Sequence, residues 1–134
     1  MSSCMLISFM REVYGIEIIE EAVIAANENA KLNGLTNCEF IAGDVAKTVK
    51  NLKEKPDLII VDPPRPGVHK DAIRDISGFG AKEIVYISCN PETQQRDLYY
   101  LTKNGYKVKK IQPVDMFPYT SHVECVALLC RATL

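Results

Sequence analysis

Short apolar runs rich in β-branched residues alternate along this chain with longer segments of helical periodicity. This alternation restricts the fold more than any other feature of the sequence, because it is typical of a parallel sheet with helices packed on its faces. We therefore predict an α/β fold with a mostly parallel sheet and an antiparallel strand near the carboxyl end. The expected strands are residues 13–18, 38–42, 58–61, 83–88, 107–114 and 123–130, and the expected helices are residues 20–33, 45–55, 69–76 and 91–103.

The length and the charge of the chain limit its class. With 134 residues it is predicted to form one domain, residues 1–134. Its 16 basic and 17 acidic residues give a formal net charge of −1, so the sequence lacks the general basic field with which many proteins attract nucleic acid. Any binding of RNA or DNA must then be local, or be assisted by another domain.

Membrane and redox signals in the sequence indicate a cytoplasmic protein. No apolar run reaches the roughly 20 residues that span a bilayer, so no membrane partner is expected. Residues 1–10 lack the basic leader and the small-residue cleavage site of a signal peptide, and we interpret them as part of the domain. The five cysteines form no C-x-x-C pair and are odd in number, which indicates neither a metal site nor a complete disulfide framework.

Four polar or reactive residues follow predicted strands at their carboxyl ends, where ligands of open α/β sheets bind. We expect these residues to lie at one edge of the sheet; they are Glu17, Asp44, Asp62 and Cys89. Asp62 opens the run Asp62-Pro63-Pro64-Arg65-Pro66-Gly67, which the prolines make a stiff loop. Acids are also common helix N-caps, which explains Asp44 equally well.

Cys89 is the candidate nucleophile. It directly follows the apolar strand predicted at residues 83–88, and a loop beyond a buried strand can hold a thiol in reach of a substrate while the scaffold fixes its direction. The alternative is a small core cysteine, since free Cys is among the most buried residue types. The motifs that follow Cys89 along the chain favour the nucleophile.

Five short motifs give the chain a family resemblance. Over residues 13–131 it resembles the carboxyl-terminal part of an S-adenosylmethionine-dependent RNA 5-methyluridine methyltransferase, of the type that acts on uracil C5 in tRNA and 23S rRNA. An Asp-Pro-Pro motif alone is weak, but its combination with Ser-Cys-Asn-Pro and a late His-Val-Glu is specific. The motifs are Val13-Tyr14-Gly15-Ile16-Glu17, Asn29-Ala30-Lys31-Leu32-Asn33-Gly34, Asp62-Pro63-Pro64-Arg65-Pro66-Gly67, Ser88-Cys89-Asn90-Pro91 and His122-Val123-Glu124-Cys125.

The resemblance implies a Rossmann-like methyltransferase sheet, S-adenosyl-L-methionine as cofactor, and tRNA or rRNA as substrate and partner. Glu17 resembles the acid that holds the ribose hydroxyls of the cofactor, Asp44 the position beside its adenine, and Asp62 the residue between cofactor and target base. Cys89 matches the nucleophile and Glu124 the general base. In the absence of Cys89, Glu124 would be interpreted as a solvent-facing strand residue.

Two further polar residues stay outside the predicted catalytic set. Arg65 can pair with a phosphate, fix its loop through a carboxylate, or lie exposed without a partner. His122 can orient Glu124 or the aromatic segment Phe117-Pro118-Tyr119, although a lone His is more often structural.

The chain departs from the family at its start. The catalytic domain of the family begins with a strand and a Gly-rich turn that cradles the methionine end of the cofactor, whereas residues 1–11 contain no glycine. Because close backbone approach to a ligand commonly needs glycine, we expect an incomplete cofactor site and weak or no activity from this fragment alone. The amino-terminal RNA-binding modules of the family and the iron–sulfur cysteine cluster of some members are also not found in this sequence.

The missing first strand leads to an expectation about the sheet. In this fold it lies between the strands predicted at residues 13–18 and 58–61. Exposed strand edges pair with whatever is available. We therefore predict that these two strands pair directly with each other, or that another chain fills the gap and the protein self-associates.

Two interpretations compete with uracil-C5 methyl transfer. The first is a non-catalytic domain that keeps the methyltransferase fold and serves as an RNA-binding or partner surface. The second is a methyltransferase that acts on a base amino group through the Asp-Pro-Pro loop and needs no cysteine. Cofactor binding tests the first alternative, and the effect of replacing Cys89 tests the second.

Overall fold

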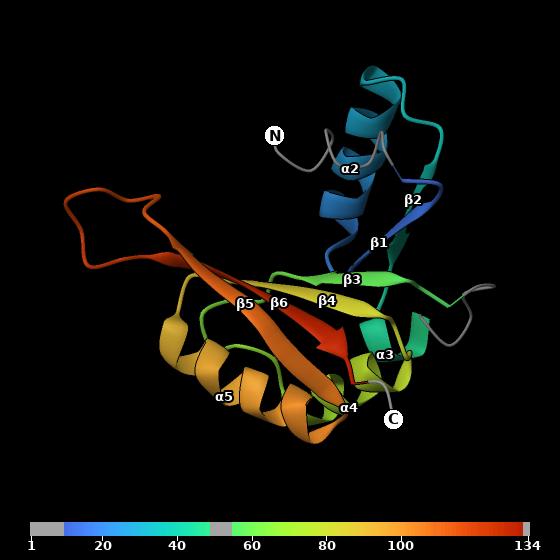
Figure 1. The fold of residues 1–134 in the computed structure, drawn as a ribbon. Coiled ribbons are helices and arrows are strands. Elements are labelled where there is room, and N and C mark those ends of the chain that lie inside the picture. Colours follow the sequence, from blue (N-terminus) through green and yellow to red (C-terminus); the bar gives the residue numbers. More distant parts are fainter. Residues whose placement is uncertain (1–9, 49–54, 133–134) are drawn as a thin grey trace. The chain divides into compact units, whose positions relative to one another are not determined.

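The computed structural model describes residues 10–48 and 55–132. The chain divides into two compact units, Met1–Leu52 and Lys53–Leu134, which are described separately below as the amino-terminal and the carboxyl-terminal unit (Figure 1). The single domain expected from the length stays a prediction. None of the described helices is both long and apolar enough to cross a membrane.

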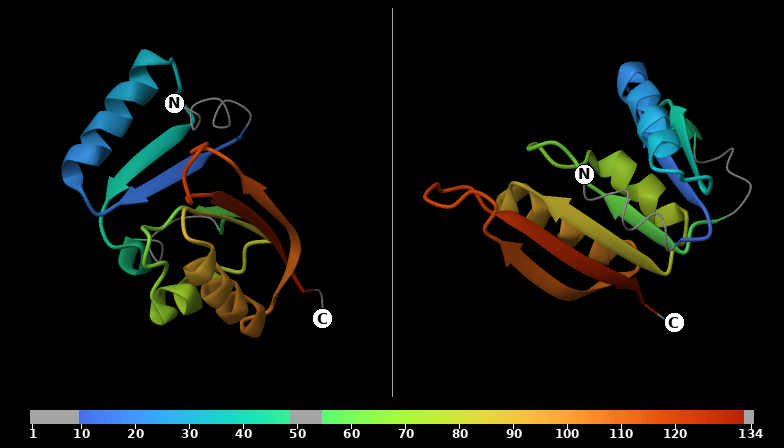
Figure 2. Two further views of the ribbon diagram at one scale, coloured as in Figure 1. Left: turned by 90° about the vertical axis from the view of Figure 1, so that its left-hand side faces the viewer. Right: turned by 90° about the horizontal axis from the view of Figure 1, so that it is seen from above.

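The amino-terminal unit contains a two-stranded parallel sheet and a helix that runs alongside it (Figure 2). Its elements are β1 (Val13–Glu17), α2 (Glu20–Leu32), β2 (Cys38–Ala42) and α3 (Val45–Thr48). Val13 lies opposite Cys38, and Glu17 lies opposite Ala42. The helix begins with acids and ends with Lys31, which suits its dipole.

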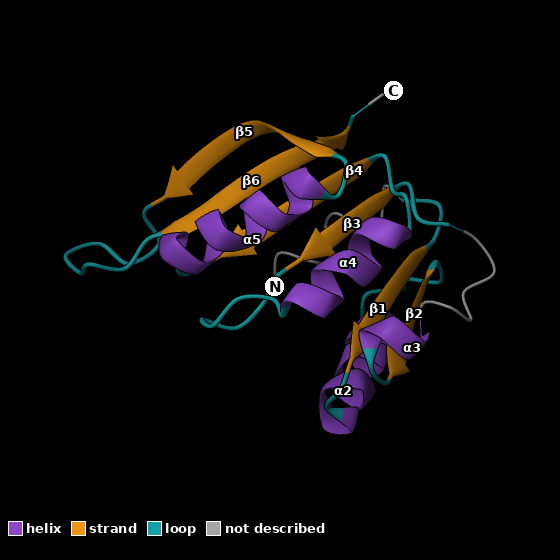
Figure 3. Cartoon of the chain, turned by 90° about the horizontal axis from the view of Figure 1, so that it is seen from below, coloured by secondary structure: helices purple, strands orange, loops and turns teal. Residues whose placement is uncertain are grey.

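The carboxyl-terminal unit contains a four-stranded sheet with the strand order β3-β4-β6-β5. Its elements are β3 (Leu58–Val61), α4 (Lys70–Gly78), β4 (Glu83–Ser88), α5 (Pro91–Lys103), β5 (Tyr106–Val114) and β6 (Glu124–Arg131). β3 and β4 are parallel, and β6 is antiparallel to both of its neighbours. Figure 3 shows α4 and α5 on the same face of this sheet.

The core of the carboxyl-terminal unit lies between these two helices and the sheet. Alternate residues of β4 and β6 face it, including Ile84, Tyr86 and Leu129, which are at most 1% exposed. The helices contribute Ile73 and Leu101. This alternation with a period of two gives the sheet one face covered by helices and leaves the intervening residues of β4 and β6 half-buried or exposed.

Most of the predicted elements are confirmed, and so is an antiparallel strand near the carboxyl end. The strands 38–42, 58–61 and 83–88 and the helix 91–103 have the predicted bounds. The helix predicted at 45–55 is described only over Val45–Thr48, because its continuation lies outside the described residues.

The structure excludes one of the two alternatives predicted for the strands at residues 13–18 and 58–61. β1 is bonded to β2 and β3 to β4, so β1 and β3 do not close directly on each other and belong to different sheets. No described strand bonds to both β1 and β3. The polar residues that were predicted to share one sheet edge therefore follow strands of two different sheets. Filling of the gap by another chain, and thus self-association, stays a prediction.

Candidate active site

The two predicted catalytic residues lie beside each other at the end of the β4–β6 strand pair. The last paired residues are Ser88 and Cys125. Cys89 directly follows Ser88, and Glu124, the first residue of β6, directly precedes Cys125, so both lie at the same end of the strand pair. A thiol and a carboxylate in this arrangement can act on the same small ring.

A short turn fixes the backbone on both sides of Cys89. The Ser88 hydroxyl accepts a hydrogen bond from the Asn90 N–H and donates one to the Asn90 carbonyl, each 3.0 Å long. The Asn90 side chain in turn caps α5 by accepting a hydrogen bond from the Glu92 N–H at 3.2 Å. Cys89 itself is half-buried and not in a disulfide. It is therefore held between a buried strand end and a capped helix.

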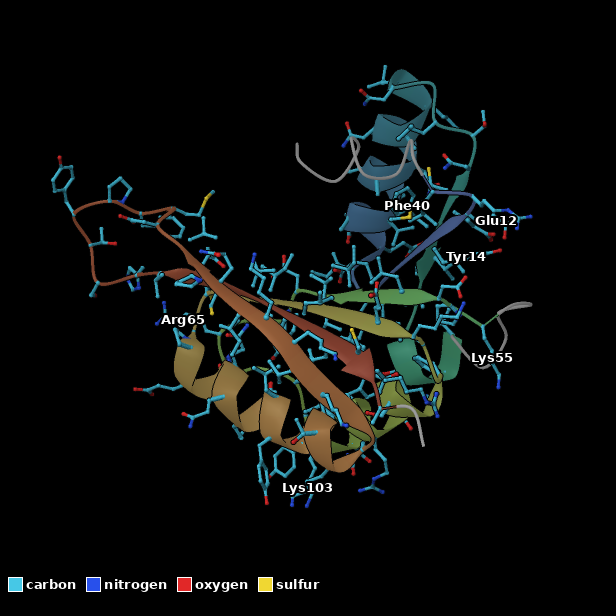
Figure 4. The ribbon with its side chains drawn as sticks, viewed as in Figure 1. Glu12, Tyr14, Phe40, Lys55, Arg65 and Lys103 are labelled. Atoms are coloured by element: carbon cyan, nitrogen blue, oxygen red, sulfur yellow. The ribbon has the colours of Figure 1, made fainter. Side chains whose placement is uncertain are left out.

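The proline-rich loop is tied to the same helix start through the carbonyl of Arg65. This oxygen accepts hydrogen bonds from Asn90 Nδ2 at 3.3 Å and from Thr93 Oγ1 at 3.0 Å. Figure 4 shows Arg65 beside the amino end of α5. Asp62, at the start of this loop, is exposed and directly follows Val61, which lies opposite Tyr86 of β4. The loop that carries Asp62 is thus anchored next to Cys89.

A fully buried carboxylate provides the second anchor of this loop. Asp97 of α5 accepts hydrogen bonds from the Tyr86 hydroxyl at 2.6 Å and from the Val68 N–H at 2.7 Å. It also forms an ion pair with Arg96, whose guanidinium donates to the Pro66 carbonyl at 2.9 Å. Burial, followed by the hydrogen bond to the Asp97 carboxylate, raises the pKa of Tyr86, so its hydroxyl remains a donor at neutral pH.

Gly67 lets the loop approach this carboxylate closely. Its φ of +79° lies in the left-handed region, and a Cβ atom there would collide with Asp97 Oδ2 and Arg96 Nη2. The loop at this point therefore requires glycine for both its conformation and its packing.

Gln94 connects the two strands that carry Cys89 and Glu124. Its side-chain amide is 2% exposed and donates to the carbonyls of Tyr86 on β4 at 3.2 Å and Cys125 on β6 at 2.8 Å. This residue fixes β4 and β6 against α5 close to the strand ends where the catalytic candidates lie.

Arg65 and His122 contact each other across two loops. Arg65 Nη1 lies 3.4 Å from His122 Nδ1, and the His122 ring packs edge-on against Phe117. Of the roles weighed for these side chains, the structure shows His122 against the aromatic loop and Arg65 against His122. This contact joins the Asp62 loop to the segment that leads into Glu124.

Glu17 and Asp44 lie together at the carboxyl end of the two-stranded sheet. The Gly43 N–H donates to the Glu17 carbonyl at 2.9 Å. Glu17 Oε1 accepts hydrogen bonds from the N–H groups of Ile18 and Ile19, and Asp44 Oδ1 accepts one from the Lys47 N–H at the start of α3. Asp44 thus makes the helix N-cap contact that was one of the two roles considered for it from the sequence. A carboxylate has about four acceptor positions, so both side chains can also bind a ligand hydroxyl.

A hollow of about 360 Å³ lies at the other end of the two-stranded sheet. It is lined by residues 11–14 and 36–39, at the amino ends of β1 and β2. Ligands of α/β sheets bind at the carboxyl ends, so this hollow is separate from the place where Glu17 and Asp44 lie. Among the described residues, no group of three or more His, Cys, Asp or Glu side chains is arranged to hold a metal ion.

Comparison with known proteins identifies the family of this chain. The family model described as tRNA (Uracil-5-)-methyltransferase matches residues 2–132. The chain belongs to this family.

Two proteins named as RNA methyltransferases are similar in sequence to this chain. One from Clostridium tetani is 57% identical over 121 residues, and one from Clostridium acetobutylicum is 60% identical over 120 residues. Both matches cover 90% of this chain and 26% of the relative. The chain thus spans about a quarter of the length of these relatives.

Solved structures of methyltransferases share the fold. The Pyrococcus abyssi tRNA (uracil-54, C5)-methyltransferase, solved with S-adenosyl-L-homocysteine, has a TM-score of 0.75 and 37% identity over 88% of this chain and 28% of its own. An rRNA methylase from Streptococcus thermophilus has a TM-score of 0.74 at 12% identity, over 98% of this chain and 80% of its own, and shows the fold alone. These likenesses confirm the Rossmann-like methyltransferase fold.

In this member of the family, sequence reasoning missed Gln94 and Asp97. Both are polar residues of a helix, a position that is usually exposed, yet they are 2% and 0% exposed. Their spacing of three residues places them on one side of α5. This spacing was the signal available in the sequence.

The cysteines of the carboxyl-terminal unit are expected to differ in reactivity. Cys125 is 6% exposed and burial raises the pKa of its thiol, so its thiolate is scarce at neutral pH. Cys89 is half-buried at a strand end. With limiting iodoacetamide at pH 7, peptide mass spectrometry should find Cys89 modified well before Cys125. Earlier modification of Cys125 would contradict the burial described here.

Proposed function

We propose that this chain carries the covalent machinery of an RNA uracil-C5 methyltransferase, with Cys89 as nucleophile and Glu124 as general base. The observation that supports the proposal is the β4–β6 register, because Cys89 directly follows Ser88 and Glu124 directly precedes Cys125, and Ser88 and Cys125 are the last paired residues. Family membership supports RNA as the substrate class. A uracil of tRNA or rRNA is the proposed target.

The proposed reaction explains why both groups are needed. Uracil C5 is a weak nucleophile, so the Cys89 thiolate adds to C6 and the C5–C6 electron pair moves to C5 and the C4 carbonyl as an enolate. C5 would then take the methyl group from a bound sulfonium donor, whose methyl–sulfur bond would break so that the sulfur leaves as a neutral thioether. Glu124 removes the C5 proton, the electrons of that C–H bond restore the C5–C6 double bond, and the thiolate leaves C6.

S-adenosyl-L-methionine is proposed to supply the activated methyl group when it is bound. Glu17 and Asp44 are proposed to hold its adenosine part, because their carboxylates lie together at the carboxyl end of β1 and β2 and keep acceptor positions free. Asp62 is proposed to lie beside the target base. Since residues 1–11 contain no glycine, methyl transfer by this chain alone is proposed to be weak.

The covalent step can be tested without the cofactor. Thiolate addition at C6 followed by protonation at C5 and reversal exchanges the C5 hydrogen of uracil with water, so RNA that contains [5-³H]uridine should release tritium on incubation with the chain. The test uses a tRNA transcript and, in parallel, rRNA. RNA binding in a filter assay without tritium release would instead favour the non-catalytic RNA-binding domain.

Glu124→Gln should slow tritium release strongly. The amide cannot take the C5 proton, and general base catalysis typically contributes about 10²–10⁴-fold to a rate. The variant should still bind RNA, because Glu124 is a half-buried residue at the strand end and not part of the core. Glu83→Gln, on the neighbouring strand β4 and exposed, is the matched control and should keep the full rate. An undiminished rate in Glu124→Gln would remove Glu124 from the mechanism.

A further inference from the structure

The loop between β5 and β6 exposes three large apolar side chains within four residues. The exposed fractions are 61% for Met116, 47% for Phe117 and 107% for Tyr119. Figure 1 shows this loop extending beyond the end of the four-stranded sheet. We call residues 115–122 the hairpin tip. Exposed apolar side chains that gather in one place usually mark an interaction site.

The hairpin tip has a defined turn. The Phe117 carbonyl accepts hydrogen bonds from the Thr120 N–H at 3.2 Å and the Thr120 hydroxyl at 2.7 Å, and this hydroxyl also accepts one from the His122 N–H. Tyr119 lies within the turn with a φ of 66°, which is uncommon for a residue other than glycine. The Tyr119 ring is thus presented to solvent by a turn that its neighbours hold in place.

The strand that leads into the hairpin tip is basic. Lys107, Lys109 and Lys110 of β5 are all exposed. From residue 106 to residue 122 the chain carries these three lysines and one acid, Asp115, a net charge of +2, against −1 for the whole chain. Arg65 adds a cation near the base of the tip through its contact with His122. Lysines also protect edge strands from unwanted pairing, so charge alone does not decide the role of β5.

The hairpin tip begins and ends at the strand pair that carries Glu124. Val114, the last residue of β5, lies opposite Glu124, the first residue of β6. An RNA strand that runs from the tip to its base therefore approaches the end of β6 where Glu124 lies. Proteins that hold single-stranded nucleic acid combine a basic track for the backbone with aromatic rings on which bases stack. An enzyme acting on a base must also unstack it, which leaves neighbouring bases without a partner.

We propose that the hairpin tip is a stacking platform for an unpaired RNA base near the target uridine. In this arrangement Tyr119 stacks on the base, and Lys109 and Lys110 contact the phosphates that lead to it. This inference rests on the proposed function, since it takes RNA as the substrate, but it concerns binding and not the covalent step.

The chain contains no tryptophan, so Tyr119→Trp introduces a single fluorophore at the tip. Titration of the full chain with a short single-stranded oligoribonucleotide should quench its emission, because a stacked base quenches indole, whereas inorganic polyphosphate should not. Tyr99→Trp is the matched control, since Tyr99 is a 57% exposed tyrosine on α5, and it should respond little. Equal quenching by polyphosphate, or equal quenching in the control, would overturn the stacking platform.

Binding variants provide the second readout. Tyr119→Ala should weaken binding of the oligoribonucleotide by roughly 5- to 150-fold, the loss of one base–aromatic stack, and Tyr119→Phe should keep most of the affinity. Lys110→Gln should reduce the slope of log K against log salt by about one. An unchanged affinity in Tyr119→Ala would reject the inference. The inference would also be rejected if the emission of the Tyr119→Trp chain changed with protein concentration but not with RNA. That result would mean that the tip binds a second copy of the chain.

Failure of this inference and failure of the proposed function are distinguishable. Tritium release that survives in Tyr119→Ala together with unchanged RNA affinity would reject the platform and keep the covalent mechanism. Quenching by RNA without any tritium release would keep the platform and reject the covalent mechanism.

Discussion

Cys89→Ala is expected to reduce tritium release from [5-³H]uridine RNA to the rate without enzyme. Without the thiolate nothing adds to C6, so the C5 hydrogen does not become exchangeable. RNA binding should persist, because Cys89 is half-buried in a turn that Ser88 and Asn90 hold through their own hydrogen bonds. The measurement is the initial rate of tritium release at saturating RNA.

Cys130→Ala is the matched control for this experiment. Cys130 is also a half-buried free cysteine, but it lies near the far end of β6, opposite Glu83. Its replacement should leave the rate unchanged. A Cys89→Ala chain that still releases tritium would exclude Cys89 as the nucleophile. If such a chain methylated a base amino group in RNA, the interpretation that needs no cysteine would be correct.

Asp97→Ala is expected to lower the free energy of unfolding by about 3–6 kcal/mol, because it removes two hydrogen bonds to a buried carboxylate, each typically worth about 1.5–3 kcal/mol. The variant leaves the Tyr86 hydroxyl and the Val68 N–H without their acceptor and leaves Arg96 without its carboxylate. Urea denaturation followed by circular dichroism measures this loss.

Two further variants show how much of this loss of stability comes from the contacts of Asp97. Gln95→Ala changes an exposed neighbour on the same helix and should alter stability by less than about 0.5 kcal/mol. Tyr86→Phe removes one hydrogen bond to a charged group and should cost about 1.5–3 kcal/mol. A loss in Asp97→Ala no larger than in Gln95→Ala would mean that the buried carboxylate does not stabilise the fold.

The element bounds were predictable where local signals were complete. The strand 58–61 is a continuous apolar run closed by Asp62 and prolines, and the helix 91–103 has Asn90 as its cap, Pro91 at its first position and Gly105 after its end. Local sequence determines these features through backbone geometry and capping. The helix that starts at Lys70 runs two residues past its predicted end because Ile76 and Ser77 are buried, and burial is a tertiary effect.

The candidate catalytic residues were predictable from the sequence, but the buried residues that hold the site in place were not. The resemblance provided Cys89 and Glu124, but only the pairing of β4 with β6 brings them to the same end of one strand pair. The buried Gln94 and Asp97 depend on partners that come from other elements of the fold. Nothing within α5 alone distinguishes the buried Gln94 from the exposed Gln95 except its position relative to those partners.

The antiparallel pairing of β4 and β6 also determines which changes of chain length the site can tolerate. Insertions or deletions in the hairpin tip lie outside both strands and leave Glu124 in register with Cys89. A single residue inserted within β6 would instead turn the preceding side chains to the other face of the sheet. Glu124 would then face the helices and Cys125 the open side. Length variation among relatives that keep this chemistry should therefore concentrate in the tip, while β6 stays constant in length.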